Sequence, residues 1–116
     1  DRKYSPDYNV KGVSPMELLL MGVAGCSSID IISILEKQKL NPISYKMEVE
    51  GERESKPGEP YKKIHVNLYI EGDIPGEKII RAATLSFDKY CSVSKNLEKS
   101  TSIEHSIYLN GAIIKK

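Results

Sequence analysis

Two cysteines, Cys26 and Cys91, are the side chains in this sequence best suited to chemistry. A thiolate is a nucleophile that can be oxidised reversibly, and two thiols that meet can act as an attacking and a resolving pair. Cys26 follows the small residues Gly22–Gly25, which let another backbone or a substrate approach closely. The alternative is that Cys26 is inert and only packs, because free cysteine also behaves as a small hydrophobic residue.

Each cysteine lies in a segment that is expected to be a core helix. Cys26 is inside the apolar stretch Leu18–Leu35. Cys91 is on the apolar face of a second helix, in which apolar residues recur at three- and four-residue steps from Ile79 to Leu97. Two core helices in one small domain are expected to contact each other. Helix packing can therefore bring the two thiols together despite their separation in the chain.

The apolar stretch Leu18–Leu35 is nearly long enough to cross a bilayer. It contains Asp30, and an unpaired Asp at mid-helix is costly in lipid. Its start has helix signals, with Ser14 as the N-cap, Pro15 at the first helical position and Glu17 completing a capping box. We therefore interpret it as the buried helix of a soluble domain, with no membrane partner.

Two carboxylates accompany Cys26. Glu17 precedes it by nine residues, so the two side chains point to opposite sides of a straight helix. Glu17 is then either a solvated capping carboxylate, a group that serves Cys26 of a partner chain, or a neighbour of its own Cys26 across a helix break near Gly22–Gly25. Asp30 lies four residues after Cys26, where it either disfavours the thiolate or is a structural Asp bonded to backbone or Tyr.

The two histidines are weaker candidates for a chemical role than the cysteines. His105 falls on the apolar face of the last predicted strand, as a core histidine with satisfied hydrogen bonds or as the partner of a cysteine. His65 points outward from its strand. Two His and two Cys without close spacing predict no metal site, and the sequence has no Gly-rich phosphate loop, so we expect no cofactor.

Length and composition describe one small domain. The chain has 116 residues and a mass of 13.0 kDa, so residues 1–116 form a single domain. Seventeen basic residues against sixteen acidic ones, with 7% aromatics, argue against a nucleic-acid partner. Two cysteines are too few for a disulfide scaffold and nothing suggests secretion, so we expect a cytoplasmic protein.

Alternating apolar residues predict strands over Tyr45–Glu50 and Ile64–Glu71, and a last strand from Thr101 to Asn110 that Gly111 ends. The order helix, strand, strand, helix, strand predicts an α+β domain with antiparallel strands and helices packed on one face. Three strands are too few to cover two helices, one of which is apolar nearly all round. We therefore expect further N-terminal strands outside this chain, and a second copy that forms a homodimer.

Three segments together resemble the OsmC/Ohr superfamily, most closely its YhfA-like branch: Ser14–Leu20 (SPMELLL), Gly25–Ser27 (GCS) and Lys89–Ser94 (KYCSVS). The resemblance covers essentially the whole chain. It implies an OsmC-like fold, in which two central helices pack against the sheet in an intertwined homodimer with two active sites at the subunit interface.

Members of the superfamily are thiol-dependent peroxidases that act on organic hydroperoxides. By this likeness Cys26 is the peroxidatic cysteine, Cys91 the resolving one, and Glu17 matches the family carboxylate. The well-studied branches also supply an Arg from the region before the Ser-Pro-x-Glu motif. Here that region is short and Arg2 is the only Arg in it, so Arg2 is the candidate for that role, although it is not aligned with the family position.

The leading hypothesis is a peroxidase. The Cys26 thiolate is oxidised to a sulfenic acid by an organic hydroperoxide, Cys91 condenses with it to a disulfide, and an external dithiol reduces the disulfide. Apolar walls would favour alkyl or lipid hydroperoxides; the expected wall residues are Leu19, Leu20, Met21, Val23 and Tyr90. The alternatives are a non-catalytic dimer that binds a small apolar ligand at the subunit interface, and a structural stress protein with packing cysteines.

Overall fold

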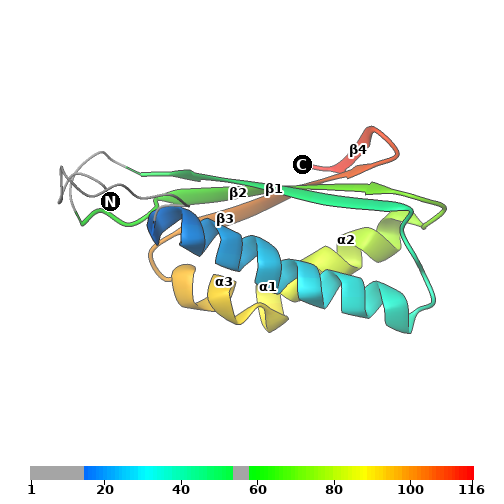
Figure 1. Ribbon diagram of the computed structural model, residues 1–116, viewed down its shortest axis with the longest axis horizontal. Coiled ribbons are helices and arrows are strands. Elements are labelled where there is room, and N and C mark those ends of the chain that lie inside the picture. Colours follow the sequence, from blue (N-terminus) through cyan, green and yellow to red (C-terminus); the bar gives the residue numbers. More distant parts are fainter. Residues whose placement is uncertain (1–14, 54–57) are drawn as a thin grey trace, which may run out of the picture.

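A four-stranded sheet carries all the helices on one face in the computed structural model, which describes residues 15–53 and 58–116 (Figure 1). The order of elements mixes helices and strands, as an α+β domain requires. The elements are α1 (Pro15–Lys37), β1 (Ser44–Glu52), β2 (Lys63–Glu71), α2 (Gly76–Leu85), η2 (Ser86–Tyr90), α3 (Ser92–Leu97), β3 (Ser102–Leu109) and β4 (Ala112–Lys115).

The strands lie in the order β1-β2-β3-β4. β1 pairs antiparallel with β2, as predicted, with Val49 opposite Val66. The prediction of antiparallel strands is wrong for the central pair, because β2 and β3 are parallel. The helical segment between them returns the chain to the end of the sheet at which β2 began, so β3 runs in the same direction as β2.

β4 was not predicted, although the sequence carries a strong signal for it. Asn110 and Gly111 both adopt positive φ, 51° and 85°. An Asn-Gly pair in this conformation forms the tight turn of a two-residue hairpin. Leu109 accordingly pairs with Ala112 across the turn, and the chain continues as a short antiparallel edge strand instead of ending its strand structure at Gly111.

α1 is one continuous helix that passes through Gly22 and Gly25 without a break. It ends at Lys37, where Lys39 takes φ 60° and the Leu40 N–H donates to the Leu35 carbonyl at 2.9 Å. Ser14, the expected cap, lies outside the described residues. Every fourth residue faces the sheet and is buried: Val23, Ser27, Ile31 and Leu35.

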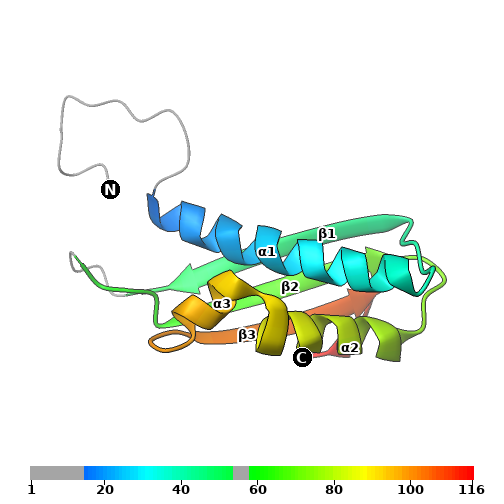
Figure 2. The same cartoon turned by 90° about the horizontal axis from the view of Figure 1, so that it is seen from below.

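The second predicted helix is two helices joined by a π-turn. α2 passes into η2, and the chain then leaves helical geometry at Cys91, with φ −77° and ψ 102°, before α3 begins. The Cys91 N–H donates to the Ser86 carbonyl at 2.7 Å, which closes the π-turn. Figure 2 shows α1 running beside α2 and α3 on the same face of the sheet. The alternate residues of β2 that face these helices are buried: Ile64, Val66, Leu68 and Ile70.

Candidate active site

Cys26 lies in the middle of α1, next to the buried face of the helix, and is half-buried. Gly22 is one turn earlier on the same side, and a Cβ added there would lie 3.5 Å from Val93 of α3. This is an ordinary van der Waals distance, so a methyl group would fit between Gly22 and Val93. The two residues mark where α1 packs against α3, one turn before Cys26.

Cys91 lies at the break between η2 and α3 and is fully buried. The prediction that it would lie on a continuous helical face is therefore wrong, but the prediction that it would be buried is confirmed. The Cys26 side chain lies close enough to the Cys91 thiol to raise the pKa of that thiol. The Ser94 hydroxyl donates a hydrogen bond to the Cys91 sulfur at 3.1 Å. The structure thus brings together the two thiols that the sequence places in separate segments.

The two cysteines have different surroundings. Burial raises the pKa of the Cys91 thiol, the Ser94 hydroxyl and backbone N–H lower it, and the Cys26 side chain raises it again, with burial the largest influence. Cys91 therefore keeps its proton, whereas Cys26 is the more exposed of the pair. This asymmetry suits Cys26 to meet a small molecule first and Cys91 to react second.

Asp30 holds a structural position between α1 and η2. The Ser86 hydroxyl lies 3.1 Å from an Asp30 carboxylate oxygen, to which it donates, and 3.3 Å from the Ser27 carbonyl. The interpretation of Asp30 as a structural carboxylate is supported, but its partner is a serine hydroxyl and not backbone or Tyr.

Glu17 is exposed in the first turn of α1, on the side of the helix away from Cys26. Nine residues of helix separate the two along the axis by about 13 Å. Because the helix is unbroken, Glu17 does not reach Cys26 of the same chain, which excludes one of the three interpretations. Arg2, the candidate activating cation, lies outside the described residues.

His105 lies between the sheet and the helices, with its ring stacked on Phe87 at a centroid distance of 4.8 Å. Its Nε2 atom is buried without a hydrogen-bond partner among the described residues, so the expectation of a satisfied core histidine is wrong. Burial, with a smaller effect of Lys115, lowers the pKa of His105 to about 4. The ring is therefore neutral near pH 7.

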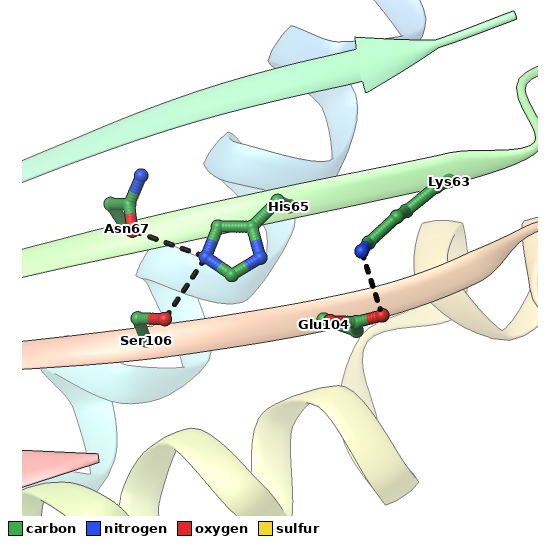
Figure 3. A network of polar contacts seen from close by, with 5 residues as sticks. All are labelled: Lys63, His65, Asn67, Glu104 and Ser106. Atoms are coloured by element: carbon green, nitrogen blue, oxygen red, sulfur yellow. Dashed lines mark hydrogen bonds and ion pairs between the residues drawn. The ribbon is translucent and has the colours of Figure 1, made fainter. Parts of the chain in front are cut away.

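His65 lies on the opposite face of the sheet, as predicted (Figure 3). Its Nε2 is 2.9 Å from the Ser106 hydroxyl and 3.2 Å from the Asn67 carbonyl oxygen. Beside it Lys63 forms an ion pair with Glu104 at 3.3 Å. These contacts link β2 to β3 and stay far from the thiols. Within residues 15–53 and 58–116, no group of three His, Cys, Asp or Glu side chains is arranged to hold a metal ion.

α1 leaves an apolar stripe uncovered in the single chain. Leu18 and Met21 are each 54% exposed and Ile29 is 72% exposed, with the exposed Gly25 between them at helical spacing. By length and composition alone α1 also fits a membrane span, and 22% of its most apolar window is buried. The prediction that Val23 forms part of the wall around Cys26 is wrong, because Val23 is fully buried against the sheet.

Comparisons with known proteins agree with this fold. A family model described as OsmC-like protein matches residues 8–106. Protein YhfA of Escherichia coli strain K12 is 37% identical over 97 residues, which are 83% of this chain and 72% of YhfA. A hypothetical protein of Aquifex aeolicus VF5, solved by crystallography, is 30% identical, with a TM-score of 0.77 over 88% of this chain and 79% of that chain.

The crystal structure of an organic hydroperoxide resistance protein OsmC from Legionella pneumophila has the same fold at 16% identity. Its TM-score is 0.67, and the match covers 85% of this chain and 72% of that chain. The resemblance to the OsmC/Ohr superfamily is thus confirmed by the family model, by sequence relatives and by fold. The chain belongs to the OsmC-like protein family.

Proposed function

We propose that the protein is a thiol-dependent peroxidase that reduces organic hydroperoxides to alcohols. The observation that carries this proposal is the proximity of the half-buried Cys26 to the fully buried Cys91 thiol, whose pKa it raises. Two neighbouring thiols that differ in exposure are what a sulfenic acid and its resolving partner require. The name of the Legionella relative, an organic hydroperoxide resistance protein, supports the same substrate class.

In the proposed cycle the Cys26 thiolate attacks the distal oxygen of the hydroperoxide. The O–O bond breaks, Cys26 becomes a sulfenic acid, and the alkoxide takes a proton and leaves as an alcohol. The Cys91 sulfur then attacks the sulfenic sulfur, which releases water and forms a disulfide. An external dithiol reduces that disulfide and is itself oxidised. Because the cycle needs a reducing compartment, we place the protein in the cytoplasm.

The apolar stripe of α1 is where we propose that a second copy of the chain packs to form a homodimer. The twofold axis would pass beside Met21 and Gly22, midway between Glu17 and Cys26 along the helix. In an antiparallel pair of helices this places Glu17 of one copy level with Cys26 of the other. The remaining role for Glu17 in catalysis, at the site of a partner chain, follows from this arrangement.

The test of this function is turnover with a dithiol reductant. We expect consumption of cumene hydroperoxide by the wild-type protein, loss of all consumption in Cys26→Ser, and loss of disulfide formation in Cys91→Ser. Hydrogen peroxide should be consumed more slowly, because it has no apolar group to pack against the apolar side chains expected around Cys26. Wild-type turnover no faster than that of Cys26→Ser would contradict the proposal.

A second candidate function is the binding of a small apolar ligand without thiol chemistry. The observation that favours it is a pocket of about 480 Å³ near the start of α1, whose lining includes Met16, Leu19, Tyr61 and Leu97. Such a lining suits an apolar molecule. Binding of an apolar fluorescent probe with equal affinity to wild type and Cys26→Ser, together with no peroxidase turnover, would favour this candidate.

A further inference from the structure

Ser94 is a buried polar residue in direct contact with a reactive atom of the proposed cycle. Its hydroxyl donates to the Cys91 sulfur at 3.1 Å, and its side chain is almost completely shielded from solvent. The geometry follows from the break in the second helix. Cys91 is the extended residue that precedes α3, and Ser94, three residues later in the first turn, is brought back over it.

The backbone around this contact is fixed on both sides. The Cys91 N–H donates to the Ser86 carbonyl at 2.7 Å, and the Cys91 carbonyl accepts from the Lys95 N–H at 3.0 Å. These bonds fix the backbone that carries the sulfur relative to the first turn of α3, which carries the hydroxyl. A hydrogen bond held in this way is available at the moment of reaction and costs no reorganisation.

The resolving step needs such a donor. As the Cys91 sulfur attacks, it must develop thiolate character, and in a fully buried site no solvent is present to stabilise that charge. Burial opposes the charged form, and the Ser94 hydroxyl and backbone N–H act against that effect. Among the residues that the structure describes, Ser94 Oγ is the hydroxyl that donates to this sulfur.

We propose that Ser94 is a catalytic residue of the resolving step, where its hydroxyl stabilises the Cys91 sulfur as it attacks the Cys26 sulfenic acid. This inference rests on the proposed peroxidase function. In the step a sulfur–sulfur bond forms and the sulfur–oxygen bond of the sulfenic acid breaks. The leaving hydroxide takes the Cys91 thiol proton and departs as water. The sulfenic sulfur is reduced and the Cys91 sulfur is oxidised.

Several titratable groups surround Cys91 and Ser94, and the test leaves them unchanged. On α1 these are Cys26 and Asp30, whose carboxylate accepts a hydrogen bond from the Ser86 hydroxyl. On its other side Ser94 lines a pocket of about 290 Å³, whose titratable lining residues are Asp88, Glu98, Glu104, His105, Lys115 and Lys116. A change at Ser94 leaves all of these side chains in place.

The test measures the two half-steps separately, by rapid quench and mass spectrometry after one equivalent of cumene hydroperoxide, from pH 6 to pH 9. In Ser94→Ala we expect sulfenic acid at Cys26 to form at the wild-type rate. Its conversion to the disulfide should be roughly 10-fold slower at pH 7, the effect of one lost hydrogen bond to a charged group, and its pH profile should move to higher pH. Ser94→Thr keeps the hydroxyl and should restore most of the rate.

Ser106→Ala is the matched control, because Ser106 is also a buried serine but contacts His65 on the far face of the sheet. It should resolve at the wild-type rate. Wild-type resolution by Ser94→Ala at every pH would overturn the inference, as would equal slowing in Ser94→Ala and Ser94→Thr, which would indicate packing alone.

A second measurement separates this inference from the proposed function. In Cys26→Ser, Cys91 is the remaining thiol, and the ultraviolet absorbance of its thiolate against pH reports its ionisation, whether or not the protein is a peroxidase. We expect Ser94→Ala in this background to raise the pKa of Cys91. If wild type forms no sulfenic acid and Ser94→Ala still raises this pKa, the proposed function fails while the coupling between Ser94 and Cys91 stands. An unchanged Cys91 pKa would contradict the coupling itself.

Discussion

The side chain of Cys26 lies close enough to the Cys91 thiol to raise its pKa, although one belongs to the long first helix and the other to the break between two later helical segments. In this region α1 packs against α3, where Gly22 faces Val93. Since Cys91 is sealed from solvent and Cys26 is not, Cys26 is the thiol that a small molecule can reach first.

The proposed dimer predicts that a charge on the exposed stripe of α1 will separate the subunits. Ile29→Asp would bury an unpaired carboxylate in the interface, so we expect the dissociation constant to rise by roughly 100-fold or more. Sedimentation velocity over a concentration series measures this. Ile43→Asp is the control, because Ile43 is 84% exposed but lies in the loop before β1.

The comparison of Ile29→Asp with Ile43→Asp decides whether the stripe of α1 is the subunit interface. A dimer in Ile43→Asp and a monomer in Ile29→Asp would support packing through α1. If both variants behave as the wild type does, the stripe is not the subunit interface, and the partner-chain role of Glu17 fails with it.

Gly51 of β1 is predicted to be intolerant of any side chain. A Cβ at this position would lie 2.6 Å from Cδ1 of Tyr61 and 3.0 Å from Cδ2 of Leu20. The Tyr61 ring has little freedom to move, because its hydroxyl donates to the Met16 carbonyl at 2.9 Å. We expect Gly51→Ala to lower the free energy of unfolding by about 1–3 kcal/mol in urea titrations.

A double-mutant cycle identifies the cause of that loss. With Tyr61→Ala already present, Gly51→Ala should cost little, since the clashing ring has been removed. An equal penalty in both backgrounds would mean that the clash with Tyr61 is not the reason.

Protonation of His105 is expected to lower the free energy of unfolding in mild acid. The pKa of its ring is lowered to about 4 in the folded chain, mainly by burial, and is near 6.5 in an unfolded chain. Between these values the unfolded state binds the additional proton, so stability falls as the pH drops from about 6.5 to about 4. Because the ring is only partly buried, solvent screening reduces this contribution to about 2 kcal/mol at the acid end.

His105→Phe tests this, because a phenyl ring keeps the stacking on Phe87 and cannot be protonated. Unfolding free energies at pH 7 and pH 4.5, at one protein concentration, should differ less in the variant than in the wild type. The same acid loss in both proteins would show that His105 is not its cause.

The local features of the fold were predictable from sequence. Proline at the first helical position marked the start of α1, and the strict alternation around Val66 marked β2 and its buried face. The meeting of Cys26 with Cys91 was also anticipated, because two apolar helices in a small domain have few other places to pack.

Other features depend on three-dimensional relationships that no local pattern contains. The parallel pairing of β2 with β3 follows from the path of the helices between them. The break at Cys91 replaces a helix that apolar periodicity predicts as continuous, so the contact between the Ser94 hydroxyl and the Cys91 sulfur could not be predicted. β4 is different, since the Asn110-Gly111 pair is a typical signal of a hairpin turn and is therefore sufficient to predict a further strand after it.

The most direct test of the central claim is peptide mass spectrometry of the fully reduced protein after one equivalent of cumene hydroperoxide, with Cys26→Ser and Cys91→Ser treated in parallel. We predict a rapid loss of two hydrogens, a peptide cross-linked through Cys26 and Cys91, and a trappable sulfenic acid on Cys26 only in Cys91→Ser. Thiols that remain reduced for hours in the wild-type protein would contradict this prediction.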